Sequence, residues 1–224
     1  MTQLQKLIEF LELIGYEELR LSEGEVAEQV NNNPIEELKR LEEEAKKCCK
    51  CRLCKTRTNV VFGDGDPTTN LMLVGEAPGE QEDLQGKPFV GRAGQLLNRF
   101  LNLYGVSRDK VYITNVVKCR PPNNRNPQPD EIAACYPFLE KQIELISPKV
   151  ILCLGAFAAR TILNLPEKTP ISKIRGKEFK VEIGGREVIV IPTFHPAYLL
   201  RNKRGEPEFQ KDLEKALRLA GFIK

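Results

Sequence analysis

Cysteine is the residue type whose spacing in this sequence most clearly suggests a chemical site. Cys48 and Cys51 have two residues between them, and Cys119 and Cys135 follow later with fifteen residues between them. Four thiolates can hold either zinc or an iron–sulfur cluster. Structural zinc usually takes two tight pairs, whereas a cluster tolerates a widely spaced second pair. Cys51 could equally pair with Cys54, so the spacing by itself leaves the ligand set open.

The counts of cysteine and histidine narrow the kind of site. The chain has seven cysteines and one histidine, His195, which excludes a metal site built on several histidines. We expect a cytoplasmic, intracellular protein, because the N-terminus lacks signal-peptide features and no apolar run approaches the ~20 residues of a membrane span. Thiols in a reducing compartment favour a metal site over disulfides. The alternative is that all seven are buried thiols, as we expect for Cys153.

Three polar residues fall where predicted strands end. Glu76 follows the first apolar run, Asn115 lies late in the second, and His195 follows the fourth. Open α/β sheets bind ligands beyond the carboxyl ends of their strands. A carboxylate, an amide and an imidazole are therefore expected at one edge of the sheet. The alternatives are a helix cap for Glu76 and a structural histidine at position 195.

Phe89 lies in a turn-forming segment, residues 86–91, between glycines and a proline. A core phenylalanine rarely needs such a turn, whereas a side chain that stacks on a flat ring does. An amide to read a base edge, an aromatic face and a hydrogen-bond donor are what an enzyme needs to hold a flipped-out base.

Short apolar runs alternate with helical patterns from residue 60 onward, which is typical of an α/β fold. The predicted strands are Leu71–Val74, Val111–Val117, Val150–Leu154 and Val188–Ile191. The predicted helices lie near residues 93–103, 129–146, 156–163 and 208–220. Because the runs are continuously apolar, the strands should be buried on both faces. We expect a three-layer α/β sandwich around a central, mostly parallel four-stranded sheet.

The N-terminal segment differs from the rest of the chain in charge. Residues 1–47 hold 6 basic and 12 acidic residues, whereas residues 48–224 hold 28 basic and 19 acidic ones. A basic body suits a polyanion, since each neutralised phosphate releases counterions. Residues 1–30 show helical apolar spacing, and a second helix is expected from Pro34 to about Lys47. We expect residues 1–45 to be an acidic helical extension and residues 46–224 to be the main domain.

Three segments resemble the motifs of the family 4 uracil-DNA glycosylases, the iron–sulfur branch of the uracil-DNA glycosylase superfamily. They are residues 75–79 with 86–94, residues 113–122, and residues 195–200. The resemblance runs in family order from about Cys48 to about Ala220. It implies a DNA-repair hydrolase that releases uracil from DNA and leaves an abasic site, the first step in base excision repair of deaminated cytosine.

The resemblance also implies a cofactor and its ligands. Leu53, the pair at 57–58 and the stretch 60–63 resemble the residues that follow the second cluster ligand in the family. The implied ligands of a structural, DNA-positioning [4Fe-4S] cluster are Cys48, Cys51, Cys119 and Cys135.

The roles of the strand-end residues follow from the same resemblance. His195 would donate a hydrogen bond to the uracil 2-oxygen, and Glu76 would position or activate water. Asn115 would read the 4-oxygen and the ring N–H. The remaining implied contacts are base stacking by Phe89, main-chain contacts at Gly75 and Ala77, and insertion into the duplex by Leu199, Leu200 and Arg201.

The expected partner is uracil-containing DNA, single- or double-stranded, bound by a monomer. The N-terminal extension, which the family core lacks, either packs on the body or docks a protein partner. Two other functions fit part of the sequence. A non-catalytic nucleic-acid-binding protein would account for the thiolates and the basic charge, and a glycosylase for a different damaged base would use the same pocket.

Overall fold

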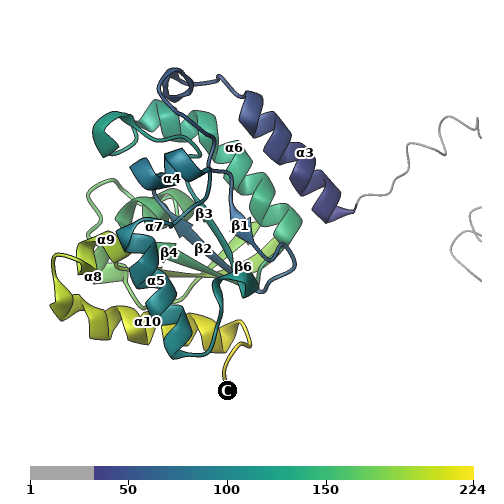
Figure 1. The fold of residues 1–224 in the computed structure, drawn as a ribbon. Coiled ribbons are helices and arrows are strands. Elements are labelled where there is room, and N and C mark those ends of the chain that lie inside the picture. Colours follow the sequence, from purple (N-terminus) through teal and green to yellow (C-terminus); the bar gives the residue numbers. More distant parts are fainter. Residues whose placement is uncertain (1–32) are drawn as a thin grey trace, which may run out of the picture. The chain divides into compact units, whose positions relative to one another are not determined.

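Apolar side chains on both faces of the central strands produce a sheet that helices cover on both sides (Figure 1). In the computed structural model, which describes residues 33–224, six strands form one mixed sheet in the order β1-β3-β2-β4-β6-β5. The strands are β1 (Asp64–Gly65), β2 (Leu71–Gly75), β3 (Tyr112–Asn115), β4 (Val150–Leu154), β5 (Phe179–Ile183) and β6 (Arg186–Thr193). The inner four, β3, β2, β4 and β6, run parallel, and the two edge strands pair antiparallel.

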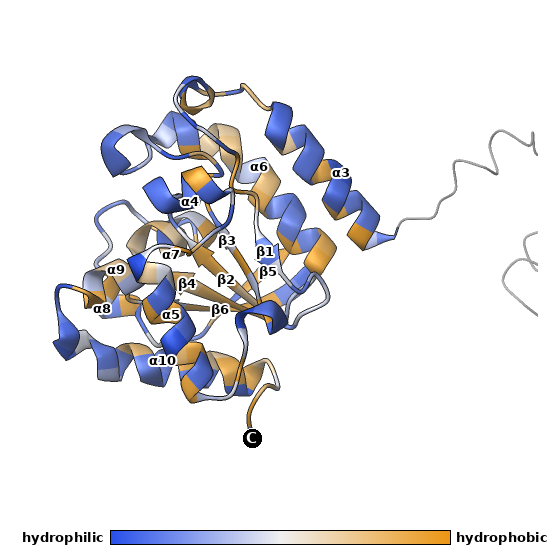
Figure 2. Ribbon diagram, in the orientation of Figure 1, coloured by the Kyte–Doolittle hydropathy of each residue, from blue (hydrophilic) through white to orange (hydrophobic). Residues whose placement is uncertain are grey.

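Alternation along the strands divides the core into two apolar layers. In β2, Leu71 and Leu73 belong to one layer, whereas Met72 and Val74 belong to the other. The first layer packs on α5 (Arg92–Leu103), α9 (Pro196–Leu199) and α10 (Glu206–Leu219). The second packs on α3 (Pro34–Lys47), α6 (Pro129–Ile146), α7 (Ala156–Ile162) and α8 (Ile171–Ile174). Figure 2 shows apolar strands in the middle and helices of mixed hydropathy around them. This confirms the predicted α/β sandwich.

The predicted number of strands was wrong, because the sheet has six. The four predicted strands are the four parallel ones in the middle of the sheet. The search for continuous apolar runs could find only strands that are covered on both faces. β1 is two residues long, and β5 alternates between partly and more fully exposed residues, as expected at an edge.

The long helices begin and end close to where the sequence predicted. α6 has the predicted bounds, and α5, α7 and α10 differ from theirs by one or two residues at either end. The helix expected from Pro34 to about Lys47 is α3. The single-turn helices α8 and α9, and the short α4 (Glu80–Gln85), were not predicted. No helix within residues 33–224 is both long and apolar enough to cross a membrane.

The acidic extension predicted for residues 1–45 lies mostly outside the described residues. Its last part, α3, belongs to the compact unit that runs from Pro34 to Lys224. Leu38 and Ala45 on α3 are buried in the same apolar layer as α6. The helix at the end of the predicted extension is therefore part of the core. The helix predicted in residues 1–30 concerns residues that the structure does not describe.

Candidate active site and cysteine centre

The carboxyl ends of the parallel strands border a cavity of about 410 Å³. β2 ends at Gly75 and β3 ends at Asn115, and these two residues are paired in the parallel register. His195 follows β6, which ends at Thr193. The predicted site residues that line the cavity are Glu76, Ala77, Phe89, Asn115, His195 and Arg201. The structure thus brings together the carboxylate, the amide and the imidazole, as expected for the strand ends of an α/β sheet.

Gly75 lies directly behind the lining of the cavity. A Cβ atom at this position would come within 2.4 Å of Asn115 Oδ1 and 2.6 Å of Phe89 Cζ. Both distances are shorter than any van der Waals contact, so a side chain at Gly75 would displace the amide and the ring. The main chain at Gly75 therefore lies directly against the side chains of Asn115 and Phe89.

Asn115 presents an acceptor without a partner. Its side chain is 1% exposed, and its Oδ1 has no hydrogen-bond partner among the described residues. Leaving a buried acceptor unsatisfied costs on the order of 1–3 kcal/mol. An N–H group of a bound molecule would remove that cost, so the amide is arranged to accept a hydrogen bond from a ligand.

The main chain holds Phe89 in a conformation that its side chain disfavours. Phe89 has φ 52°, in the left-handed region, which costs an L-residue about 1–2 kcal/mol. Glu82 Oε1 accepts hydrogen bonds from the N–H groups of Val90 at 2.9 Å and Gly91 at 2.8 Å. On the other side, Arg108 donates to the carbonyl oxygen of Phe89 at 2.9 Å. These two side chains, which sequence reasoning missed, fix the ring at the edge of the cavity.

His195 is positioned as a neutral hydrogen-bond donor. Its Nδ1 accepts a hydrogen bond of 3.1 Å from the main-chain N–H of Ala197. Burial, with the positive charge of Arg201 as a second cause, lowers the pKa of His195 to about 4. At neutral pH the ring is uncharged, and its single proton is on Nε2. The ring centroid lies 5.6 Å from that of Phe89, so both rings border the same space.

Glu76 is the carboxylate of the cavity. Burial raises the pKa of Glu76 to about 7, and the positive charge of Arg160 opposes this shift. A carboxyl group with such a pKa can exist in either protonation state near neutral pH. This is the range in which a group can exchange a proton with a bound water molecule.

The residues predicted to insert into DNA separate into two groups. Leu199 is fully buried and packs in the apolar layer with α5 and α10. It is therefore unavailable for insertion, which corrects that part of the prediction. Successive residues of a helix point about 100° apart, so its neighbours face outward instead. Leu200 is 38% exposed and Tyr198 is 40% exposed, and Arg201 lines the cavity.

The loop that follows Cys119 completes the wall of the cavity. Asn123 and Asn124 both have positive φ, at 55° and 53°. Arg125 is held in place by a bidentate pair with the buried Glu131, at 2.6 and 2.8 Å. Asn124 and Arg125 line the cavity, and sequence reasoning missed both. The signal was the pair of asparagines, the residue type that most readily adopts the left-handed region after glycine.

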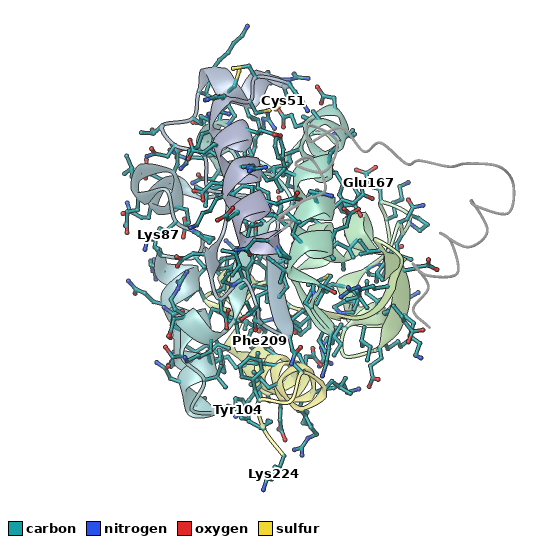
Figure 3. The ribbon with its side chains drawn as sticks, turned by 90° about the vertical axis from the view of Figure 1, so that its right-hand side faces the viewer. Cys51, Lys87, Tyr104, Glu167, Phe209 and Lys224 are labelled. Carbon is teal, nitrogen blue, oxygen red and sulfur yellow. The ribbon has the colours of Figure 1, made fainter. Side chains whose placement is uncertain are left out.

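The four predicted cysteine ligands line one small cavity, and Cys54 lines it too. Because Cys48 and Cys54 both line the cavity, proximity does not decide which of them is the partner of Cys51. Cys51 is at the far end of the molecule from the C-terminal Lys224 (Figure 3). In residues 33–224, no three His, Cys, Asp or Glu side chains are arranged as they would be around a bound metal ion. Cys153 is fully buried in β4, as predicted.

The surroundings of these cysteines fit a metal–thiolate centre. Arg57 Nη1 donates to Cys119 Sγ at 3.1 Å, and the main-chain N–H of Lys118 donates to Cys135 Sγ at 3.2 Å. Hydrogen bonds to cysteine sulfur stabilise its anionic form and are typical around iron–sulfur clusters. Burial raises the pKa of Cys119 to about 11, although Arg57 opposes this. A bound cation is what would hold such a thiol deprotonated.

Comparison with known proteins agrees with this geometry. Residues 62–219 match the Uracil DNA glycosylase superfamily. The type-4 uracil-DNA glycosylase of Thermotoga maritima is 52% identical over 184 residues, which is 81% of this chain and 92% of that protein. The type-4 enzyme of Archaeoglobus fulgidus is 48% identical over 84% of this chain and 95% of its own length. That of Sulfurisphaera tokodaii is 46% identical over 83% and 86%. The chain belongs to the uracil DNA glycosylase superfamily and, within it, to the type-4 uracil-DNA glycosylases.

Proposed function

We propose that this protein is a DNA-repair hydrolase that cleaves the N-glycosidic bond of deoxyuridine in DNA, releasing uracil and leaving an abasic site. The observation that carries the proposal is the Oδ1 of Asn115, which has no hydrogen-bond partner within residues 33–224 and lies in the same cavity as the neutral His195. Uracil offers a ring N–H between two carbonyl oxygens, which matches a buried acceptor and a nearby donor. The family relationship supports the same activity.

His195 acts on the charge that develops as the bond breaks. Cleavage leaves negative charge on uracil, which collects at the 2-oxygen. The Nε2–H of a neutral His195 donates a hydrogen bond to that oxygen. Donors aimed at developing charge are worth about 100- to 1000-fold in rate. The hydrogen bond from Ala197 supports this role, because it keeps the proton on Nε2.

Glu76 acts on the attacking water and the sugar, and Phe89 acts on the extruded base. The carboxylate form of Glu76 positions water for attack on the sugar carbon and favours the positive charge that develops on the sugar. The ring of Phe89 stacks on the extruded base, as expected for an enzyme that reads a flipped base by its face and its edge. The main chain at Gly75 and Ala77 adds contacts to the base.

A cluster of the [4Fe-4S] type is proposed for the cysteine cavity, with Cys48, Cys51, Cys119 and Cys135 as its ligands. The donor set supports it, because the four thiols line one cavity and three of them accept N–H···S bonds. When bound, the cluster cross-links distant parts of the chain and has no redox step in base removal.

The proposal extends to how DNA is bound. Leu200 and Arg201 fill the space that the base leaves in the duplex, and Leu199 is excluded because it is buried. A monomer acts on single- or double-stranded DNA inside the cell. Of the segment 1–45, α3 belongs to the catalytic body, and we propose that the residues before it dock a protein partner.

The test is a substrate comparison. Matched oligonucleotides that carry uracil, hypoxanthine or a thymine mismatch are incubated with the full chain, and the free base and abasic sites are measured. Release of uracil alone is the expected result. Release of another base in preference to uracil would assign a different glycosylase activity, and binding without release of any base would make this a nucleic-acid-binding protein.

A further inference from the structure

Lys118 lies between the cysteine cavity and the base-reading amide. It is among the largest fully buried side chains of residues 33–224, with 1% of its surface exposed. Its main-chain N–H donates to Cys135 Sγ at 3.2 Å, and its side-chain ammonium donates to the main-chain oxygen of Asn115 at 2.7 Å. One residue therefore contacts both sites, through its main chain on one side and its side chain on the other.

The ammonium group of Lys118 is fully hydrogen-bonded. Besides the Asn115 carbonyl, its Nζ donates to Thr114 Oγ1 at 2.7 Å and to Gln142 Oε1 at 2.5 Å. An ammonium group has three N–H donors and no acceptor. The three oxygens around Nζ therefore use every donor that the group has.

The three oxygens around Nζ are held in place as acceptors. The Thr114 hydroxyl donates its own proton to the Phe62 carbonyl at 2.7 Å. Gln142 Nε2 donates to the same carbonyl at 3.0 Å, which turns its Oε1 toward Lys118. The network around Nζ therefore fixes both the side chain of Lys118 and the main-chain oxygen of Asn115.

The side chain of Lys118 also links the two segments that carry the later cysteines. Lys118 directly precedes Cys119, and Gln142, which accepts from its Nζ at 2.5 Å, lies on α6, the helix that carries Cys135. This hydrogen bond therefore joins the loop of Cys119 to the helix of Cys135.

We propose that Lys118 is a positioning residue that ties the base-reading Asn115 to the cysteine centre, because its hydrogen bonds join the end of β3 and the loop of Cys119 to α6, the helix of Cys135. This role rests on the proposed function. Lys118 touches neither the base nor the sugar. It holds the main-chain oxygen of Asn115 at the end of β3. In this way it keeps Oδ1 of Asn115 where that atom can accept a hydrogen bond from the ring N–H of uracil.

The test uses Lys118→Met in the full chain, since methionine is of similar length but has neither charge nor donors. Single-turnover uracil release should fall at least about 10-fold, the scale of one well-placed hydrogen bond to a charged group. In an Asn115→Ala background the same change should cost less than about 2-fold, because residues that act through one another are non-additive. A chelator should remove iron from Lys118→Met faster than from the unchanged protein.

Leu139→Ala is the matched control. Leu139 is fully buried in the same apolar layer and lies on α6, the helix that carries Cys135, but it contributes no polar group. Its loss should lower thermal stability and leave iron release unchanged at temperatures well below unfolding. Its effect on the rate, if any, should add to that of Asn115→Ala. Thr114→Val, which removes one acceptor of the ammonium group, gives the test a second variant if Lys118→Met does not fold.

Additive losses for Lys118→Met and Asn115→Ala, or iron release no faster than in the unchanged protein, would overturn the assignment of Lys118. Failure of the unchanged protein to release uracil would overturn the proposed function instead. The two failures are therefore distinguishable in one set of measurements.

Discussion

The main-chain N–H of Ala197 donates a hydrogen bond of 3.1 Å to Nδ1 of His195. This bond connects the first turn of α9 to the ring and decides which nitrogen carries the proton. Since burial keeps the ring neutral, a single N–H remains, on Nε2. The position of one main-chain amide thus makes Nδ1 of the only histidine the acceptor and Nε2 the donor.

Replacing His195 should affect the rate far more than DNA affinity. If His195 stabilises charge that develops only during bond cleavage, His195→Ala should lower single-turnover uracil release about 100- to 1000-fold. Equilibrium DNA binding should stay close to normal and remain strongly salt-dependent. His195→Gln, which retains an N–H donor, should recover part of the rate. A parallel loss of binding, rate and thermal stability in His195→Ala would instead indicate a structural histidine.

The pH dependence of the rate should report Glu76. Because the carboxylate form is the active one and burial raises the pKa of Glu76 to about 7, uracil release should increase with pH through neutrality and then level off. Glu76→Gln should be slower and should lose this dependence. Its folded state should also gain stability relative to the unchanged protein above pH 7, because ionising a carboxyl group whose folded pKa is raised disfavours folding. Rates measured from pH 5 to pH 9 that decrease across neutrality would contradict this role.

Removing Glu82 should release the strained turn at Phe89. Glu82→Ala removes the acceptor for the N–H groups of Val90 and Gly91, so the left-handed φ of Phe89 loses support on one side. We expect weaker base retention and a destabilisation of about 1–3 kcal/mol in denaturant unfolding. Glu80→Ala is the control, since the Glu80 side chain is 60% exposed and forms only a surface ion pair. Equal effects of the two substitutions would mean that Glu82 does not hold the turn.

The colour of the purified protein should depend on four cysteines. Thiolate-to-iron charge transfer should make it brown, and serine at Cys48, Cys51, Cys119 or Cys135 should abolish the visible absorbance. Cys153→Ala should leave the absorbance unchanged, because Cys153 lies in the core of β4. Cys54→Ser decides the open question of the ligand set, and we expect it to keep its colour. Stoichiometric zinc without iron in anaerobically prepared protein would refute the cluster.

Two deletions should behave differently at the N-terminus. Removing residues 1–32 should spare uracil release on short oligonucleotides, because every proposed site residue lies at Cys48 or beyond. Removing residues 1–47 should lower the melting temperature by several degrees, because Leu38 and Ala45 of α3 are buried against the core. Circular dichroism melting of both proteins, alongside the activity assay, separates the two outcomes. Loss of activity in the shorter deletion would place part of the site in the acidic segment.

The central strands could be predicted because strands that are buried on both faces consist of consecutive apolar residues. In β4, all five residues are buried, and such a pattern is found only where helices cover both faces. β5 could not be found in this way, since its outer face is partly exposed and charged residues alternate with apolar ones. β1 has too few residues for any periodicity to be visible.

Part of the site follows from topology, and part depends on contacts between distant residues. Parallel strands place Gly75 beside Asn115, so their meeting was predictable from the order of the strands. The bond between Lys118 and Gln142 joins residues 24 positions apart, on a loop and on α6, and no local pattern indicates it. The burial of Leu199 likewise depends on how α9 is rotated against α5, which sequence motifs do not specify.

The order of the cysteines along the chain has a consequence for the unfolded state. Cys48 and Cys51 precede β1, whereas Cys119 follows β3 and Cys135 lies in α6. In the proposed centre, ligation ties these positions into closed loops on the order of 70 to 90 residues. By the arithmetic used for cross-links, such closure disfavours the unfolded chain by ~4 kcal/mol. Loss of the metal would therefore lower the melting temperature even if every contact in the sheet were preserved. The reason is that the unfolded chain would regain the conformational entropy that the closed loops remove.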